Sequence, residues 1–213
     1  MSFAPFDALA ASLLPLVDGG TDGSHDTSHL ARVWANARLI LAEEGGDAEL
    51  LAAAVLLHDC VRVEKSSPLR PQASRLAAER AREILGAMGW RADRVEAAAH
   101  AVAAHSFSAG IAPETREARI LQDADRLEAI GAIGVARCFY TAGRMGSLLY
   151  DADDPRAERR PLDDRSYAID HFRAKLLTLE GGFRTPAGTR LARERTQVVA
   201  DFLAAFEREV GAG

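Results

Sequence analysis

The chain has 213 residues, of which 48% are hydrophobic and 27% are charged, and its formal net charge is −5. This length is enough for one sizeable hydrophobic core, and because no obvious linker divides the chain we predict a single domain over residues 1–213. The negative charge disfavours a nucleic-acid polymer as partner. The chain also lacks a run of about eighteen or more apolar residues, which a membrane-spanning helix would need.

Apolar residues recur at spacings of three and four along almost the whole chain, and no alternating β-branched run is bounded by hairpin turns. We therefore predict an all-α fold in the form of a compact helical bundle. The first helix is expected over residues 6–17, and it forms an N-terminal part, residues 1–22, with the Gly-rich connection that follows. No basic residue precedes its hydrophobic positions, as one would in a secretory signal, so we expect a cytoplasmic protein.

Capping residues and glycines bound the remaining helices. We predict these helices over residues 27–45, 48–61, 73–88, 92–106, 115–140, 165–180 and 187–209. Two polar segments that contain proline, residues 66–71 and 151–164, are predicted as loops between them. The last helices make up a C-terminal helical extension, residues 141–213.

The most informative segment is the predicted helix over residues 48–61. Eight consecutive apolar residues, Leu50 to Leu57, run directly into His58 and Asp59. A helix that is apolar on all sides belongs in a protein core, and an ionised Asp buried there needs a partner or a bound cation. A divalent metal would satisfy both polar side chains, but two ligands alone would not hold it.

Two more polar residues adjoin apolar helical patterns and are candidates for the remaining ligands. His29 opens the helix that begins near Thr27, and Asp125 lies in the sequence Gln-Asp-Ala-Asp-Arg-Leu over residues 122–127. Asp123 competes with Asp125 for the last ligand position. The two residues differ by about 200° around a helix, so only one of them can face a metal.

The order of these groups, a His, then His-Asp, then an Asp in an Ala-Asp-Arg-Leu context, resembles the HD-domain superfamily of metal-dependent phosphohydrolases. It is most similar to the small stand-alone bacterial HD hydrolases, and the resemblance extends from about His25 to Glu209. The blocks that carry it are Leu57-His58-Asp59, Ala104-His105-Ser106-Phe107-Ser108, Gln122-Asp123-Ala124-Asp125-Arg126-Leu127 and Asp170-His171-Phe172.

The resemblance implies an HD-type bundle in which His29, His58, Asp59 and Asp125 bind a divalent metal ion, such as Mn²⁺, Mg²⁺ or another transition metal. The family's Ala-Asp-Arg-Leu context favours Asp125 as the ligand. Asp123 is then expected to act as a cap, as an ion-pair partner or as support behind the ligands.

The resemblance also implies an activity, the hydrolysis of a phosphoester or phosphoanhydride bond by metal-activated water. The expected substrate is a nucleotide or another small phosphorylated metabolite. Asp59 is one candidate proton acceptor and His105, which adjoins a helix end, is the other. His105 is equally open to interpretation as a core or surface histidine, and in some HD proteins extra histidines hold a second metal.

Cations are expected to hold the phosphate oxygens that the metal does not reach. The candidates for substrate binding are Arg32, Lys65, Arg126, His171 and Lys175. For each of them, a solvated surface charge is the alternative interpretation.

Other motifs of catalysis fail a direct check, because the chain has no Walker A sequence, no paired CxxC set, no HExxH and no Gly-x-Ser-x-Gly. Gly131 and Gly134 follow no predicted strand, so they indicate close helix packing and no phosphate loop. The rival hypothesis is a regulatory protein that binds metal or nucleotide without turnover. A di-iron oxygenase would need more histidine ligands, and a homodimer stays an open alternative.

Overall fold

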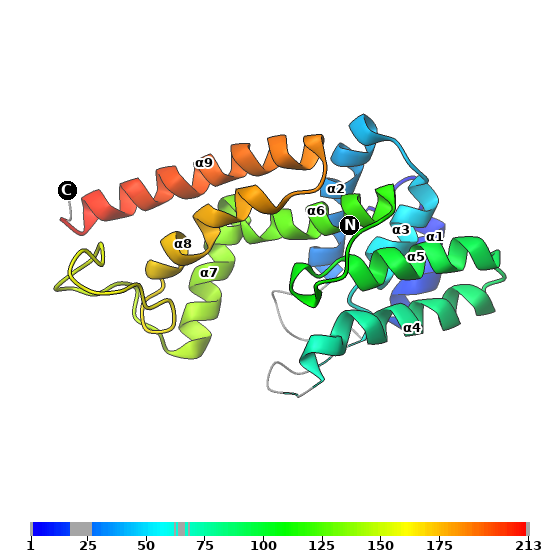
Figure 1. Cartoon of the computed structure of the whole chain (residues 1–213), viewed down its shortest axis with the longest axis horizontal. Helices are drawn as coiled ribbons and strands as arrows, with labels where there is room; N and C mark the ends of the chain where they lie inside the picture. The colour runs from blue at the N-terminus through cyan, green and yellow to red at the C-terminus, as the bar shows by residue number, and fades with distance from the viewer. Residues whose placement is uncertain (1, 18–26, 62, 64–66, 68, 212–213) are drawn as a thin grey trace. The chain divides into compact units, whose positions relative to one another are not determined.

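The computed structural model describes residues 2–17, 27–61, 63, 67 and 69–211. Within these residues the chain is helical, and its only β-type pairing is an isolated bridge between Leu148 and Tyr167 (Figure 1). The predicted all-α fold is confirmed. Among the described helices, none combines the length and the apolar character needed to cross a bilayer.

The chain forms two compact units. The first comprises residues 1–126 and 184–188, and the second comprises residues 127–183 and 189–213. The single domain that we expect over residues 1–213, with its N-terminal part and its extension from residue 141, stays a prediction.

The helices of the first unit surround α3, which forms its centre. They are α1 (Asp7–Leu13), α2 (Thr27–Glu44), α3 (Ala48–Leu57), α4 (Ala73–Ala87), α5 (Ala92–Ala104) and α6 (Arg116–Arg126). Every residue of α3 from Leu50 to Leu57 is at most 5% exposed, as its unbroken apolar sequence predicts. The Asp47 carboxylate accepts a hydrogen bond from the Leu50 N–H at 3.0 Å and caps the helix, so its predicted start is correct.

The end of α3 differs from the prediction. We expected the helix to continue to residue 61, but it ends at Leu57, and His58 and Asp59 lie in the turn that follows. The reason lies in the last turn, where the Val55 carbonyl, which residue 59 would engage in a longer helix, accepts a hydrogen bond from the His58 imidazole at 2.7 Å.

The predicted helix over residues 115–140 is wrong, because the chain breaks inside it. After α6 a 3₁₀ turn covers Leu127–Ala129, and α7 begins afresh at Gly131 and runs to Met145. Gly131 has φ of 72°, a conformation that favours glycine. At Gly134, a Cβ atom would stand 2.4 Å from the Ala129 carbonyl oxygen, so the close packing that we expected of this glycine is present.

The predicted helix over residues 165–180 is only partly present. The structure has a short helix α8 (Asp170–Ala174) and a 3₁₀ segment, Leu176–Gly182. Residues 165–169 are not helical, since the Asp163 carboxylate accepts the N–H groups of Arg165 and Ser166 and closes a turn there.

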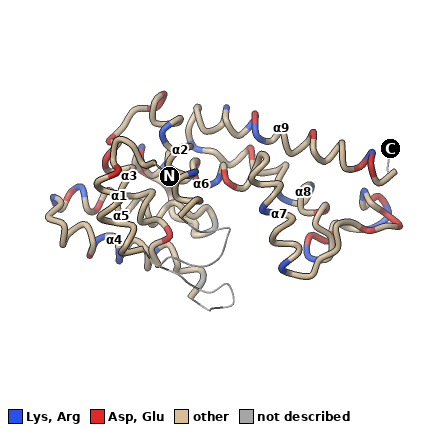
Figure 2. Tube along the Cα trace, turned by 180° about the vertical axis from the view of Figure 1, so that it is seen from behind, with Lys and Arg blue, Asp and Glu red and all other residues tan. Residues whose placement is uncertain are grey.

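The last helix, α9 (Pro186–Glu209), matches the predicted helix over residues 187–209 and bears interspersed charges of both signs (Figure 2). In the second unit it contributes Phe202 and Phe206 to an aromatic cluster with Phe139 and Phe172, whose ring centroids lie 5.6–6.3 Å apart. Phe172 is fully buried and the other three rings are half-buried, so the cluster packs α9 against the other helices of this unit.

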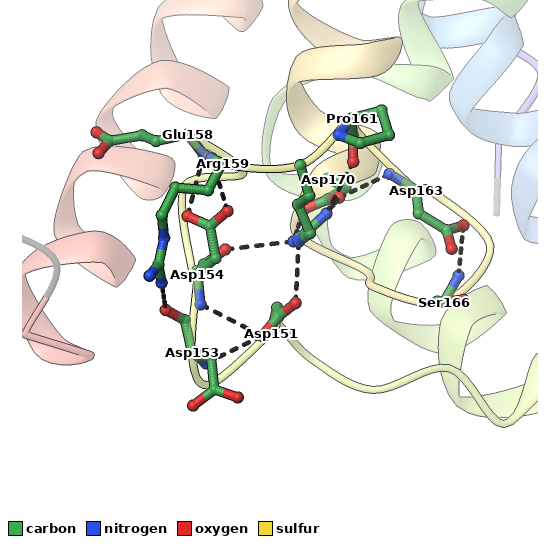
Figure 3. A network of polar contacts seen from close by, with 10 residues as sticks. Asp151, Asp153, Asp154, Glu158, Arg159, Pro161, Asp163, Ser166 and Asp170 are labelled. Carbon is green, nitrogen blue, oxygen red and sulfur yellow. Dashed lines mark hydrogen bonds and ion pairs between the residues drawn. The ribbon is translucent and has the colours of Figure 1, made fainter.

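The predicted polar loop over residues 151–164 is irregular but is held by a polar network (Figure 3). Arg160 is central to it, with its Nε 2.9 Å from Oδ2 of Asp151 and its Nη2 3.1 Å from Oδ1 of Asp170, which is fully buried. The Asp154 carboxylate accepts two backbone N–H groups farther along the loop. In the other predicted loop, residues 66–71, residues 66 and 68 lie outside the described residues, and a 3₁₀ turn, Arg70–Gln72, begins at its end.

Candidate metal centre

Five polar side chains converge in the first unit. His29 lies in the first turn of α2, His58 and Asp59 follow α3, His105 follows α5, and Asp125 lies in the last turn of α6. Nε2 of His29 is 3.3 Å from Nε2 of His58 and 3.4 Å from Oδ1 of Asp125. Of the Asp59 carboxylate oxygens, Oδ2 lies 3.6 Å from Nε2 of His58 and Oδ1 lies 3.7 Å from Nε2 of His105. The structure therefore brings the four expected ligands together, with His105 beside them.

Two of the histidines are oriented by the ends of the helices that precede them. Nδ1 of His58 donates to the Val55 carbonyl at 2.7 Å, and Nδ1 of His105 donates to the Val102 carbonyl at 2.6 Å. The last carbonyl groups of a helix lack helical N–H partners, so they accept readily from a side chain. Because a carbonyl oxygen only accepts, Nδ1 carries the hydrogen in both rings and Nε2 is left as the group that can bind a metal.

The spacing of the ligand atoms fits a bound cation. Atoms at about 2.1 Å from one metal ion lie roughly 3.0 Å apart at right angles and roughly 4.2 Å apart on opposite sides. Nε2 of His29 and Nε2 of His58 lie 3.3 Å from each other and 3.4–4.0 Å from the nearest oxygens of Asp59 and Asp125, within that range. His29, His58 and Asp125 form one group whose ligand atoms lie within 4.8 Å of one another, and His58, Asp59 and His105 form a second. Imidazole nitrogens combined with carboxylate oxygens suit a transition metal or Mn²⁺.

The cluster is shielded from solvent on the side of its histidines and accessible on the side of its carboxylates. His29, His58 and His105 are buried, whereas the Asp59 side chain is 43% exposed and that of Asp125 is 29% exposed. A pocket of about 290 Å³, lined by both Asp59 and His105, adjoins the cluster. A small ligand can therefore reach the carboxylate side of the centre.

Burial and neighbouring charges shift the pKa values of two histidines in opposite directions. Burial acts to lower the pKa of His58, but the Asp59 and Asp125 carboxylates and the Val55 carbonyl outweigh it, so the pKa of His58 is raised. Burial, aided by the nearby His58, lowers the pKa of His105. His105 is thus held in its neutral form, with Nε2 available to accept a proton.

Comparisons with known proteins identify the family. A model of the HD domain matches residues 27–130, the segment that contains all five side chains of the cluster. The chain is also 30% identical, over 190 residues, to YpgQ of Bacillus subtilis (strain 168), an uncharacterized protein, with 87% of this chain and 84% of YpgQ covered. The chain belongs to the HD-domain family.

Solved structures of HD-domain relatives have the same fold. The structure of B. subtilis YpgQ in complex with ADP matches with a TM-score of 0.72 and 28% identity, over 95% of this chain and 96% of that one. An HD-superfamily hydrolase from Bacillus thuringiensis matches with a TM-score of 0.74 and 26% identity, over 97% of this chain and 99% of that one. The relatives of this HD domain therefore include hydrolases.

Asp123 and Asp125 have separate roles in this HD domain. Asp123 is fully buried and accepts hydrogen bonds from the N–H of Arg184 at 2.8 Å and from the N–H and hydroxyl of Thr185 at 2.8 and 2.7 Å. Burial raises the pKa of Asp123, although these hydrogen bonds oppose the shift. Thr185 in turn caps α9 by accepting from the Gly188 N–H at 2.9 Å. Asp123 thus supports the chain at residues 184–188, while Asp125 faces the histidines.

Two buried amides fix α6 beside the other helices of the HD domain. The Asn36 amide of α2 donates to the Ala124 carbonyl at 3.1 Å, directly before Asp125. The Gln122 amide of α6 donates to the Ala104 carbonyl at 2.7 Å, directly before His105. These bonds join the backbone segments that carry three of the converging groups.

Two guanidinium groups share one aromatic ring near the metal centre. The Cζ atom of Arg126 lies 4.0 Å from the ring centroid of Phe107, and that of Arg184 lies 5.6 Å from it. The Nε of Arg184 donates to Oε1 of Gln122 at 2.9 Å. Burial, together with the neighbouring Arg184, lowers the pKa of Arg126, against the opposing charge of Asp123. Sequence reasoning selected Arg126 but missed Arg184, which lies 58 residues later and has no local motif.

The other predicted substrate-binding residues are Arg32, Lys65, His171 and Lys175, and their role stays a prediction. Arg32 donates from Nη1 to the Ser28 hydroxyl at 2.8 Å, one turn away on α2. Lys65 lies outside the described residues. His171 and Lys175 belong to the second unit, where they line a pocket of their own.

Proposed function

We propose that the chain is a metal-dependent phosphohydrolase that cleaves a phosphoester or phosphoanhydride bond in a nucleotide or another small phosphorylated metabolite. The observation that carries the proposal is the grouping of His29, His58 and Asp125, with Oδ2 of Asp59 3.6 Å from Nε2 of His58, a donor set suited to a divalent cation such as Mn²⁺, Mg²⁺ or another metal ion. Two further facts support it, the family's hydrolases and the ADP bound to YpgQ.

Each side chain of the cluster has a distinct role in the proposed hydrolysis. When bound, a divalent cation lowers the pKa of a coordinated water and neutralises charge on phosphoryl oxygens. His29, His58, Asp59 and Asp125 would hold the ion, and Asp59 would also orient the attacking water. His105 faces Asp59 at 3.7 Å and is kept neutral by burial, so its Nε2 can accept the proton of that water.

The substrate phosphate is expected to approach from the exposed side of the carboxylates. Arg126 follows a ligand directly in sequence, and its guanidinium is supported by the face of Phe107. We expect this oriented guanidinium to bind a phosphoryl oxygen of the substrate, and Arg184 to add a second contact. Arg32, on the same helix as His29, stays a weaker candidate because it already donates to Ser28.

The test is the release of phosphate and pyrophosphate from a panel of nucleotides and phosphorylated metabolites. Metal-stripped protein is assayed with Mn²⁺, Mg²⁺, Co²⁺ or no metal, and Asp59→Ala is assayed in parallel. The proposal requires release that depends on added metal in the wild type and is lost in the variant. Saturable ligand binding without any product would instead indicate a regulatory binding protein.

A further inference from the structure

The second unit contains a pocket of about 510 Å³, lined by residues of α7, of α8 and of the segment between them. All of the lining residues lie in this unit, so none of them belongs to the metal centre. Part of the wall is made of small residues, Ala129, Gly134, Ala142 and Ala168. Another part carries basic side chains, Arg137, Arg165, His171 and Lys175.

The charges that line this pocket do not cancel. Its one acidic residue, Asp164, is paired with His171, since Oδ2 of the carboxylate lies 3.0 Å from Nδ1 of the imidazole. Arg137 donates from Nη1 to a neutral backbone carbonyl at 3.2 Å. Among the described residues, no carboxylate forms an ion pair with Arg165 or Lys175. The three positive charges of Arg137, Arg165 and Lys175 therefore exceed the single negative charge of Asp164 in this concave space, whether or not His171 is protonated.

We infer that this pocket binds a small phosphorylated molecule, with the phosphate at Arg137, Arg165 and Lys175 and the organic part against the small residues. Its volume lies in the range of roughly 300–1,000 Å³ that is usual for small-molecule sites. Guanidinium groups and ammonium groups are the side chains that bind phosphate oxygens most strongly. The inference goes beyond the proposed activity, because it requires neither a metal nor turnover.

Sequence reasoning assigned His171 and Lys175 to the substrate of the metal centre, which stays a prediction. Both line the same pocket as Cys138, whose thiol donates to the Ala168 carbonyl at 3.6 Å. Cys138 is partly exposed, whereas the other cysteine, Cys60, is buried. A ligand in the pocket should therefore shield Cys138 from a reagent, and Cys60 serves as an internal control for unfolding.

The experiment follows the alkylation of Cys138 by iodoacetamide in the full-length protein, with ADP and inorganic phosphate as separate probes and mass spectrometry as the readout. We expect ADP to slow the labelling of Cys138 in a saturable manner. Lys175→Gln and Arg165→Gln should each raise the ADP concentration that half-protects Cys138 by roughly tenfold, since a hydrogen bond to a charged group is lost. Arg208→Gln, which removes the same charge from an exposed position of α9, should leave it unchanged.

Two results would overturn the inference. One is that neither ADP nor inorganic phosphate at millimolar concentration protects Cys138 from alkylation. The other is that Lys175→Gln, Arg165→Gln and Arg208→Gln all need the same ADP concentration to half-protect Cys138. His58→Ala separates this inference from the proposed activity, because protection should persist in that variant although turnover is lost. A loss of protection in His58→Ala would likewise contradict a pocket that works without the metal centre.

Discussion

The pair Asp123 and Asp125 offers a sharp contrast between a structural and a metal-binding carboxylate on one helix. In Asp123→Asn, one carboxylate oxygen becomes an NH₂ group that faces an N–H or hydroxyl donor of Arg184 or Thr185. The loss of a hydrogen bond to a charged group costs about 1.5–3 kcal/mol. Because burial already raises the pKa of Asp123, part of this cost is offset, and we expect about 2 kcal/mol.

For a chain of this size, that loss corresponds to a fall in Tm of about 4–8 °C for the metal-free protein. Asp125→Asn should cost less than about 1 kcal/mol without metal, since this side chain is partly exposed. With metal at about a thousand times its Kd, the wild type should gain about 4 kcal/mol, and Asp125→Asn should lose most of that gain.

The assay is thermal unfolding followed by circular dichroism, with and without Mn²⁺, together with the metal content of the dialysed protein. Asp123→Asn should melt earlier but keep its metal, and Asp125→Asn should lose its metal but keep its metal-free Tm. The reasoning is refuted if Asp123→Asn is the variant that loses the metal, or if Mn²⁺ stabilises Asp125→Asn as much as the wild type.

Three other predictions concern the second unit. Gly134→Ala should lower the free energy of unfolding in urea by about 3 kcal/mol, because its Cβ atom meets a backbone carbonyl oxygen. Gly143→Ala, whose Cβ atom has open space around it, should raise that free energy by up to about 1 kcal/mol. Changes of the same sign in the two variants would contradict the packing. Arg160→Ala leaves the buried Asp170 carboxylate without its cation and should cost about 3–5 kcal/mol in the same assay, and a cost under about 1 kcal/mol would be incompatible with this network. Burial raises the pKa of the Cys138 thiol to about 11, which favours the unreactive protonated form. The alkylation rate of Cys138 at pH 8 should therefore be about one-thousandth of its limiting rate, and the rate should rise until the pH reaches about 11. A rate that levels off near pH 9 would rule this out.

Local signals in the sequence predicted most helix boundaries but missed those set by a single backbone interaction. Asp47 and the apolar run after it give the start of α3 correctly, because capping is a local property. The end of α3 depends on the bond from the His58 ring to a carbonyl, which hydrophobic periodicity does not record. The break before α7 depends on the positive φ of Gly131, a residue that periodicity treats like any other apolar position.

The candidate site was predictable to the extent that its residues stand beside apolar helical patterns. His29, His58 and Asp125 have this mark, and helical geometry alone requires that Asp123 and Asp125 point apart. The partners that give Asp123 its structural role lie 61 and 62 residues away, at residues 184 and 185, and only the folded chain brings them near. Arg184 was missed for the same reason.

The most direct test of the metal centre measures bound metal and phosphate release in the same preparations of the wild type and His58→Ala, with circular dichroism as the check on folding. The account predicts about one divalent ion per wild-type chain, and a folded His58→Ala protein that has lost both the metal and the activity. A His58→Ala protein that is free of metal and still releases phosphate would contradict it.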